Sequence, residues 1–490
     1  MATVDIKQKQ KETVVCQQCS TFSPLSSSVR VGGSYFCSKA CCLLKNNIMG
    51  RKNTKIRSTR RIAIFGWGSY LDNNKAEAAP ISCFKHCMKD SWLSVAVGTI
   101  VEVPLPRSEV DEPGNSPIFW FARIVKLAGY EGCGSDSKLD FWVNICSPDV
   151  HEIGWCATNK KQIRVPISLR DKREEWQEFL IKKLTGTVSY PENFYREFLE
   201  ELGRHHFCTG MVAEVVDKLW SESGGDDFWC HKDSSIIHPV GWATHVGHRL
   251  HAGSSYVKSS HDSYLGKAVN PNHCTRDMFI QDPTKLSIPT DRGQGFAVGM
   301  KLEAIDPLNL STICIATVMK VLKDNYLMIG IDGAVDSKDG SDWFCYHATS
   351  ASILPIGYCD THDIPLTPPK GHVGKFVWQQ YLKDTKSRAA PVACFTTRPP
   401  NHMFKVGMKL EAVDLIDPRL ICVATVAQCV GRLLKIHFDG WESSFDQWVD
   451  CESPDIYPVG WCEMVSYNLE GPKANSNTGA STEAKRIKMN

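Results

Sequence analysis

The residues best suited to chemistry in this chain lie in one short stretch of its last third. Phe438, Trp441 and Phe445 surround an Asp-Gly turn at positions i, i+3 and i+7, and Asp414 follows a strand-like run upstream. Three aromatic faces and a carboxylate form a receptor for a poorly hydrated cation such as methylated lysine, since cation–π contacts stabilise by roughly 0.5–2 kcal/mol each. The same aromatic residues could instead pack inward as the core of a barrel.

Four cysteines near the N-terminus form a second candidate site. Cys16-x2-Cys19 is followed, after 17 intervening residues, by Cys37-x3-Cys41. Cysteine pairs at these spacings are typical of a structural zinc site with four thiolate ligands. A segment of about 30 residues is too short to form a stable hydrophobic core without such a bound metal. We therefore predict one structural Zn²⁺ bound by Cys16, Cys19, Cys37 and Cys41; the alternative is four incidental cysteines in a chain that has 21.

The elements that must position these residues recur four times. The string Gly-Met-Lys-Leu-Glu-Ala-x-Asp occurs at 299–306 and at 407–414, and looser copies with the Gly-x3-Glu spacing begin at Gly98 and Gly210. Each copy leads to an Asp/Trp element and then to a Gly-aromatic pair. A period near 108 residues is too long for a solenoid and suits tandem small domains. The chain is therefore predicted to be an array of four domains.

Each repeat is predicted to combine a helical arm with a small barrel. The pattern Trp-x2-Tyr-Leu at 67–71 recurs at 378–382 and, with Phe in place of Tyr, at 176–180. Aromatic residues and Leu at i, i+3 and i+4 suit a short helix that a following Pro ends. The subsequent runs of Val, Ile and Thr between Gly and Asp turns indicate short antiparallel strands. The predicted fold is mostly β: a zinc finger and four repeats, each an arm plus about five strands.

The predicted boundaries follow from these landmarks. They are 10–45 for the zinc finger, 46–61 for a basic linker, 62–168, 172–262, 263–370 and 374–470 for the four repeats, and 471–490 for a disordered tail. Repeats 1 and 2 are predicted to be truncated. Repeat 1 passes from 119–125 to Glu131 without the second strand of the central pair. Repeat 2 spans 17 residues from Gly210 to Asp227, where repeat 4 spans 39.

Composition limits the classes of function. The 490 residues are 42% hydrophobic with a formal net charge of +2, which implies packed cores and no global field for polyanions. No apolar run approaches the roughly 18 residues of a membrane span, and the polar first residues do not resemble a signal peptide. We expect an intracellular protein with buried, reduced cysteines and no membrane partner. The absence of a Gly-rich nucleotide loop and of a His-x-x-x-His motif argues against an enzyme.

The repeats resemble malignant brain tumour (MBT) repeats, a family of chromatin readers, and the Phe-Cys-Ser string at 36–38 resembles the FCS-type zinc finger of Polycomb-group proteins. In that family a competent repeat uses the Asp after the Leu-Glu-Ala strand and an aromatic trio. By motif position, the resemblance implies a methyl-lysine site in repeat 4 made of Asp414, Phe438, Trp441 and Phe445. Two departures occur: Phe445 replaces a common Tyr, and Asp417 stands where some binding repeats have Asn.

The resemblance implies a nuclear reader or adaptor of mono- and dimethylated lysine on histone tails. Histone H4 is favoured and H3 is the alternative, with subunits of Polycomb-type or acetyltransferase complexes as partners. The finger implies contact with RNA, and the basic linker fits phosphate, although such a run is more often a solvated linker or an import signal. An RNA- or DNA-binding scaffold with vestigial repeats is the alternative function. Repeat 3 has Ile331-Asp332-Gly333-Ala334 where repeat 4 has Phe-Asp-Gly-Trp, so we expect binding in repeat 4 alone.

Overall fold

The computed structural model describes residues 65–85, 91–105, 107–111, 116–134, 141–171, 175–192, 194–195, 237–250, 254–267, 295–333, 342–396, 400–465 and 467–472, with a few isolated positions and short strand pairs elsewhere. Those pairs are β1 (Thr13–Val15) with β2 (Phe22–Pro24), β3 (Val29–Val31) with β4 (Ser34–Phe36), and β9 (His206–Phe207) with β10 (Cys230–His231). The predicted zinc ligands, the basic linker, all but the first two residues of the tail and most of the repeat 2 barrel lie outside the described residues.

Repeats 3 and 4 contain the same six-stranded curled sheet. In repeat 4 the strands are β17 (Lys409–Val413), β18 (Ile421–Val430), β19 (Leu433–Phe438), β20 (Gln447–Asp450), β21 (Ile456–Tyr457) and β22 (Leu469–Glu470). They pair in the order β20-β19-β18-β17-β21, and β22 runs parallel to β18. Repeat 3 keeps this order with β11 (Lys301–Asp306), β12 (Asn309–Val321), β13 (Tyr326–Ile331), β14 (Phe344–His347), β15 (Ile353–Leu354) and β16 (Leu366–Thr367). The predicted mostly β fold of MBT repeats is confirmed.

Alternation along the strands explains why each sheet closes around a core. Leu410, Ala424 and Phe438 share one register row across β17, β18 and β19, and all three are buried. The long central strand must bend to pair with both neighbours. A register shift between Val426 and Gln428 provides this bend, because a bulge increases the local twist. The long central strands of repeats 1 and 3 shift at the matching place.

Repeat 1 retains the strand that its sequence was predicted to lack. Its sheet has the order β5 (Ile100–Pro104), β6 (Phe119–Ala128), β7 (Glu131–Gly134), β8 (Phe141–Asn144), and β7 pairs with both β6 and β8. The prediction for repeat 1 is therefore wrong. The strand is only four residues long and half glycine, so it shows no hydrophobic alternation. A Cβ added at Gly132 would lie 2.4 Å from Cδ1 of Ile145, so a larger residue there would require the Ile145 side chain to shift.

Three of the described arms pack on a barrel other than the one that follows them in sequence. The arm of α11 (Trp378–Asp384) and η6 (Val392–Cys394) packs on the barrel of repeat 3, where Ala390 N donates to Lys301 O at 2.9 Å. The arm of α5 (Trp176–Leu184) likewise joins the barrel of repeat 1, where Ser189 pairs with Ile100. Helix α8 (Ser254–Tyr264) packs on α7 (Trp242–Val246) at the end of repeat 2. An arm thus completes the barrel before it.

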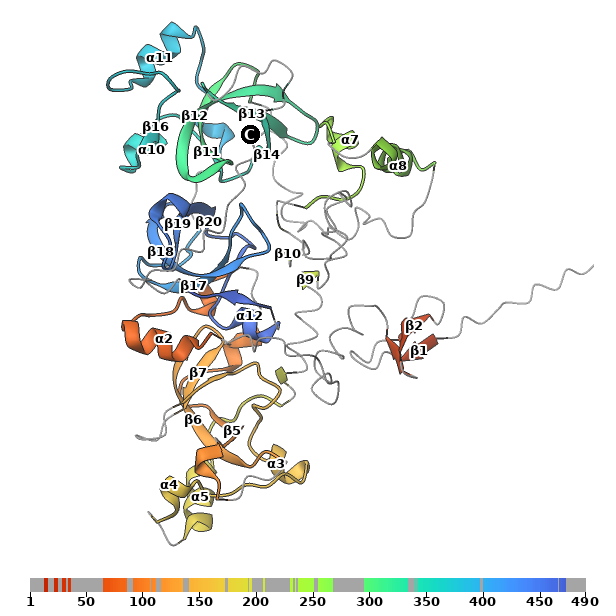
Figure 1. Cartoon of the computed structure of the whole chain (residues 1–490), viewed down its shortest axis with the longest axis vertical. Coiled ribbons are helices and arrows are strands. Elements are labelled where there is room, and N and C mark those ends of the chain that lie inside the picture. Colours follow the sequence, from red (N-terminus) through yellow and green to blue (C-terminus); the bar gives the residue numbers. More distant parts are fainter. Residues whose placement is uncertain are drawn as a thin grey trace, which may run out of the picture.

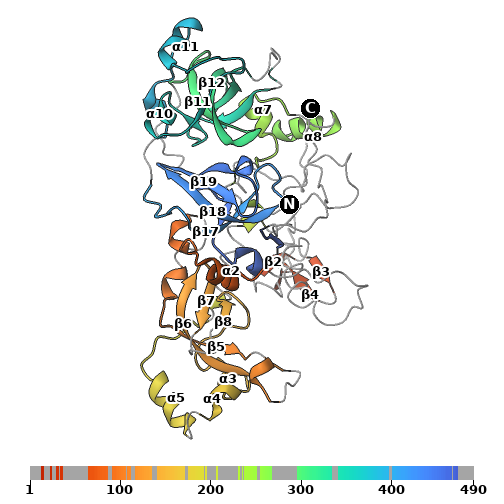
Figure 2. The same ribbon diagram turned by 60° about the vertical axis from the view of Figure 1, so that its left-hand side comes forward.

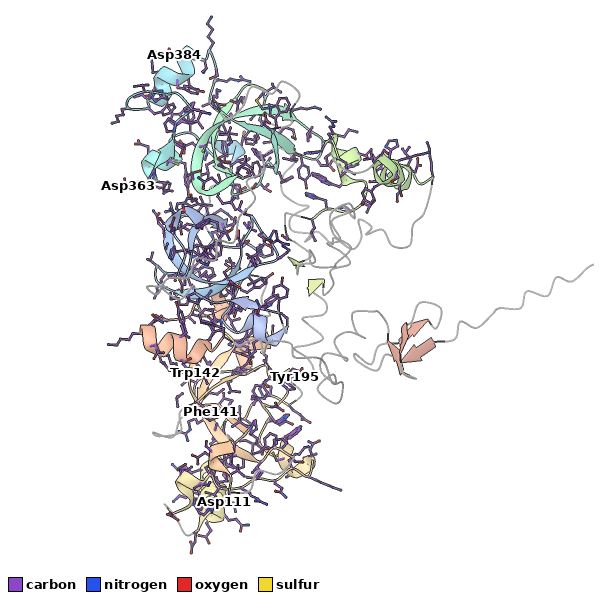
Figure 3. All side chains as sticks on the ribbon, in the orientation of Figure 1. Asp111, Phe141, Trp142, Tyr195, Asp363 and Asp384 are labelled. Carbon is purple, nitrogen blue, oxygen red and sulfur yellow. The ribbon has the colours of Figure 1, made fainter. Side chains whose placement is uncertain are left out.

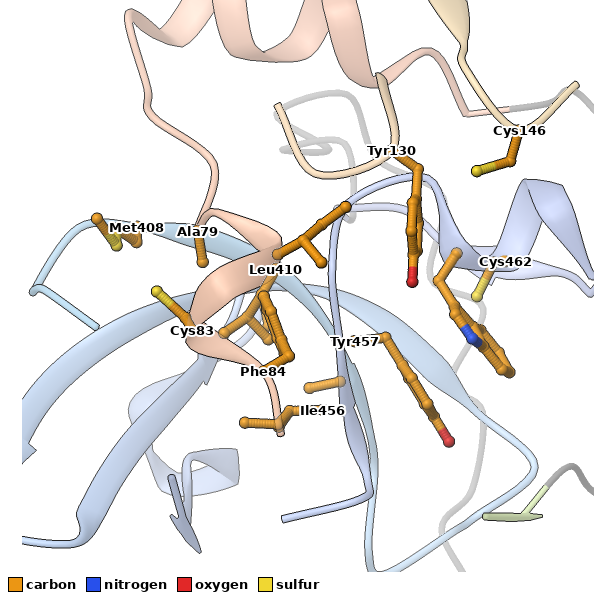
Figure 4. Close-up of a cluster of buried hydrophobic side chains, with 14 of the residues drawn as sticks. Ala79, Cys83, Phe84, Tyr130, Cys146, Met408, Leu410, Ile456, Tyr457 and Cys462 are labelled. Atoms are coloured by element: carbon orange, nitrogen blue, oxygen red, sulfur yellow. The ribbon is translucent and has the colours of Figure 1, made fainter. Parts of the chain in front are cut away.

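The first arm, α2 (Trp67–Asn74) and η2 (Ile81–Cys83), packs on the barrel of repeat 4. Ala79 N donates to Lys409 O, and Lys409 N donates to Glu77 O, both at 2.8 Å. Figure 4 shows the side chains of this arm beside the repeat 4 barrel and beside Tyr130 of repeat 1. The labelled members from the arm and from repeat 4 are Ala79, Cys83, Phe84, Met408, Leu410, Ile456, Tyr457 and Cys462. One core therefore joins the arm, repeat 4 and repeat 1.

The repeats meet through one recurring junction. In repeats 2 and 3, the short helix that starts at the aromatic residue of the Gly-aromatic pair lies against the central β-turn of another repeat: α7 of repeat 2 meets repeat 3 (Lys323 N to Val246 O, 3.1 Å), and α10 (Tyr358–Thr361) meets repeat 4. Next to α12 (Trp461–Met464), Tyr130 N of repeat 1 donates to Val459 O at 2.8 Å. Repeats 3, 4 and 1 consequently follow one another along the long axis, with α2 between repeats 4 and 1 (Figures 1 and 2). No helix in the described part of the chain is long and apolar enough to cross a membrane.

Candidate functional site

The three predicted aromatic residues lie at one rim of the repeat 4 barrel. Phe438 ends β19 and is 4% exposed, and Trp441 and Phe445 are partly buried against the same core. The rings of Trp441 and Phe445 have centroids 5.6 Å apart and planes at 76°. Trp441 lies in the turn after β19, and Phe445 closes the short helix η7 (Ser443–Phe445). The two rings therefore meet edge to face at the rim.

Asp414 lies next to this aromatic segment. Phe438 is level with Leu410 in the register, so the chain beyond β19 reaches the rim at which β17 ends. The side chain of Gln447, two residues after Phe445, links this end of β17 to the aromatic segment by hydrogen bonds. Its Nε2 donates to Val413 O at 2.7 Å, and its Oε1 accepts from Leu415 N at 3.1 Å. These two bonds flank Asp414 on either side, so its backbone is held to the strand that follows the aromatic segment.

The carboxylate of Asp414 also organises the loop that follows it. Asp414 is 6% exposed, and its Oδ1 accepts from Ile416 N at 3.0 Å. The loop closes through Asp414 N to Leu420 O at 2.9 Å. Asp417, the residue that replaces a frequent Asn, forms a two-point ion pair with Arg419 at 2.7 Å for each contact. The extra charge of Asp417 is therefore compensated within the loop.

The turn between Phe438 and Trp441 is held from inside the protein by a buried ion pair. Gly440 has φ +79°, which favours glycine. Before it, Asp439 accepts from Lys409 Nζ at 2.5 Å, from Thr425 Oγ1 and from Tyr70 Oη at 2.6 Å. Lys409 is the Lys of the repeated string, so its ammonium has a structural role. Sequence reasoning missed this role, although the matched Lys, Asp and Tyr of repeats 3 and 4 were a signal for it.

The glutamate of the repeated string has a structural role as well. Glu411 is fully buried and accepts from Gly460 N and Cys462 N at 2.8 Å each and from Trp67 Nε1 at 2.7 Å. The first two donors open the short helix α12, where a carboxylate satisfies exposed N–H groups. Burial raises the pKa of Glu411 to about 7, against the opposing effect of these hydrogen bonds. Glu303 makes the same three contacts in repeat 3, which explains why Gly-x3-Glu and Gly-aromatic landmarks recur together.

The barrels of repeats 1 and 3 do not reproduce the four-residue set in their described residues. Repeat 3 has Asp306 at the place of Asp414, but Ile331 stands at the register position of Phe438. Tyr346 enters this barrel and donates to Ile305 O at 3.2 Å, beside Asp306. In repeat 1 the residue seven positions after the first Gly is Leu105, so the carboxylate is missing. Among their described residues, neither barrel combines an acid at the place of Asp414 with an aromatic residue at the place of Phe438.

No cluster of three or more His, Cys, Asp or Glu side chains suited to a metal ion occurs within the described ranges. The cysteines described there form no disulfides and are mostly buried. Burial raises the pKa of the Cys451 thiol to about 12 and that of Cys345 to about 11, so both stay protonated near neutral pH.

Comparisons with known proteins agree with this architecture. The family model of the mbt repeat matches residues 107–170, 197–257, 300–373 and 408–476. MBT domain-containing protein 1 of Xenopus laevis is 46% identical over 455 residues, which cover 86% of this chain and 70% of that protein. The Homo sapiens protein of that name is 46% identical over 443 residues, with 84% and 68% covered. Polycomb protein Sfmbt of Drosophila melanogaster is 43% identical over 461 residues, with 87% and 38% covered.

A solved structure gives the same result in three dimensions. The crystal structure of the four MBT repeats of Drosophila melanogaster Sfmbt, in complex with the peptide RHR(me)KVLR, superposes with a TM-score of 0.71 at 41% identity. The match covers 84% of this chain and 99% of that chain. With four matched repeats, the shared fold and these identities, the chain belongs to the MBT repeat family.

Proposed function

We propose that this chain is a non-enzymatic chromatin reader that binds mono- and dimethylated lysine through repeat 4. The observation that carries the proposal is the grouping of buried Asp414 with the partly buried walls Trp441 and Phe445 at one barrel rim. Phe438 supplies the third aromatic ring. The methylated-lysine peptide bound to the four MBT repeats of Sfmbt supports this ligand class.

The preferred methylation state follows from the carboxylate. A monomethyl ammonium keeps two N–H donors, a dimethyl ammonium keeps one, and a trimethyl ammonium has none. A charge-assisted hydrogen bond to Asp414 stabilises by roughly 1.5–3 kcal/mol, and trimethyl-lysine loses it. Unmodified lysine has donors but is more strongly hydrated and fills the aromatic walls poorly. Mono- and dimethyl-lysine should therefore bind roughly tenfold more tightly than the other two forms, if about 1.4 kcal/mol remains after desolvation.

The proposed ligand is a histone tail, with H4 favoured and H3 as the alternative. The peptide in the Sfmbt complex carries basic residues on both sides of its methylated lysine, which is the charge pattern of such tails. The names of the relatives, Polycomb protein Sfmbt among them, support a nuclear location and a role beside chromatin-modifying complexes.

Calorimetry on the full chain with four peptides that differ only in methylation tests the proposal. Trp441→Ala and Asp414→Asn should each weaken binding of the monomethyl peptide, whereas Asp306→Asn should leave it unchanged. Asp306 is the matched control, because it has the same place in repeat 3 without the aromatic walls. Intact binding in Trp441→Ala, or tighter trimethyl binding in the wild type, would refute the assignment. Residues 374–470 alone are unsuitable for this test, since they carry the arm of barrel 3 and lack residues 65–85.

We also propose one structural zinc bound by Cys16, Cys19, Cys37 and Cys41. The supporting observation is that β1 and β4 lie in contact and end one residue before Cys16 and Cys37 respectively. Metal analysis of the full chain should give one zinc, and the double substitution Cys16→Ser with Cys37→Ser should remove it. Contact of the finger and linker with RNA remains a prediction, for which a gel shift with the same double variant is the test.

A further inference from the structure

The turn that carries two of the proposed cage walls is held by a residue from the opposite end of the chain. Asp439 lies directly after Phe438 and two residues before Trp441. Two of its donors, Lys409 and Thr425, belong to repeat 4 itself. The third is the hydroxyl of Tyr70 on α2, at 2.6 Å and 369 residues away in sequence.

Burial makes this contact strong. The side chains of Asp439 and Lys409 are only 7% and 13% exposed, and the Lys409 ammonium lies 5.4 Å from the centre of the Tyr70 ring. Electrostatic contacts strengthen where water is excluded. Burial and the carboxylate of Asp439 both raise the pKa of Tyr70, so its hydroxyl stays protonated and donates.

Helix α2 is in turn fixed on both of its sides. Trp67 Nε1 donates to Glu411 of repeat 4 at 2.7 Å, and Trp142 Nε1 of repeat 1 donates to Asp72 Oδ2 at 2.8 Å. Figure 3 shows Trp142 directly beneath α2. Lys126 of repeat 1 adds an ion pair to Asp72 at 3.5 Å. Repeat 1 therefore holds α2 in the place from which Tyr70 reaches the turn.

We propose that Tyr70 is a positioning residue for the methyl-lysine cage of repeat 4, so that docking of the first arm sets the affinity of the site. This inference rests on the proposed function of repeat 4. It assigns to repeat 1 and its neighbouring arm a part in binding, although repeat 1 has Leu105 at the place of Asp414.

Repeat 3 supplies a matched control for this contact. There Tyr381 Oη donates to Asp332 at 2.7 Å, Lys301 donates to Asp332 at 2.5 Å, and the Lys301 ammonium lies 5.2 Å from the Tyr381 ring. The chemistry is the same, but the turn after Ile331 carries no proposed cage.

The test uses the full chain and the monomethylated peptide RHR(me)KVLR. Calorimetry compares the wild type with Tyr70→Phe, Tyr381→Phe and Trp441→Ala, at a temperature where circular dichroism shows all of them folded. Tyr70→Phe should weaken binding about fivefold, less than a full charged hydrogen bond because Lys409 and Thr425 still hold Asp439. Tyr381→Phe should leave the dissociation constant unchanged.

A spectroscopic measurement separates positioning from a general loss of stability. The indole N–H resonance of Trp441, assigned by its disappearance in Trp441→Phe, should shift in free Tyr70→Phe protein and not in Tyr381→Phe. Equal affinities for the two Tyr variants, or weaker binding of Tyr70→Phe without a shift of that resonance, would overturn the inference. If Trp441→Ala binds as the wild type does, the proposed function itself is wrong, and the inference is wrong with it.

Discussion

Replacing Gly68 by Ala should loosen the first arm, although the same change favours an isolated helix. Gly68 is buried within α2, where Ala would gain about 1 kcal/mol of helix propensity. An added Cβ would lie 1.9 Å from Cγ and 2.0 Å from Cδ1 of Trp142. Trp142 must therefore move, which costs about 1–3 kcal/mol of overpacking. The move also breaks the bond from Trp142 to Asp72, worth about 1 kcal/mol. The net result is a loss of about 1–3 kcal/mol.

Native-state hydrogen exchange measures this loss where it occurs. The amide of Ala79, bonded to Lys409 O, should exchange roughly ten- to a hundredfold faster in Gly68→Ala. Gln379→Ala is the control, since Gln379 has the equivalent place in α11 and is exposed. In a Trp142→Ala background the sign should reverse, and Gly68→Ala should slow exchange. Slower exchange in the wild-type background would refute the steric argument.

Two further predictions concern the same junction. Ile81 and Val392 follow the same Ala-Ala-Pro string on two arms, but they are 3% and 62% exposed. Ile81→Ala should therefore lower the local stability by about 2–5 kcal/mol, and Val392→Ala by less than about 0.5 kcal/mol. Hydrogen exchange of the Ala79 and Ala390 amides measures the two losses. Comparable losses at both sites would contradict the docking of the first arm between two repeats. For Glu411, burial raises the pKa from 4.5 to about 7, so the stability contributed by its protonated form is complete below pH 4.5 and is lost as pH rises through about 7. The stability advantage of the wild type over Glu411→Gln should accordingly shrink between pH 5 and pH 8 in urea unfolding, and an advantage that grows would show that the pKa is lowered.

Local patterns predicted the local structure well. The Trp-x2-Tyr-Leu strings are helices, and the Val- and Ile-rich runs are strands of small barrels. Each of these patterns shows which face of a helix or strand is buried, and this periodicity can be recognised in a single sequence. Strand β7 was not predicted because glycine has no side chain and gives no periodic pattern. The close approach of Ile145 accounts for Gly132, and it is visible only in the structure.

The pairing of arms with barrels could not be predicted in the same way. Trp67 and Trp378 belong to the same Trp-x2-Tyr-Leu pattern, and Glu411 and Glu303 accept the same hydrogen bond from them. The residues shared by the two motifs therefore do not indicate which barrel each arm joins. The residues that differ, Gly68 and Ile81, fit the first arm to its junction, but only the structure shows the Trp142 ring and the core against which they pack. For the candidate site, the sequence named the acid and the aromatic residues, but it was silent on Gln447 and Tyr70, whose roles depend on contacts across the fold.

Because the first arm packs on repeat 4, the barrel that it joins is synthesised long after the arm itself. Tyr70 leaves the ribosome 369 residues before Asp439, a delay of roughly 20–70 s at about 5–20 residues per second. The barrel of repeat 3, with Lys301, Glu303 and Asp332, emerges during that delay and offers the first arm the same hydrogen bonds. Helix α11 follows that barrel closely in the chain and reaches it at a high effective concentration. The arm of α11 and the first arm therefore compete for the barrel of repeat 3 during folding. If the first arm binds there, it is no longer available to pack on repeat 4.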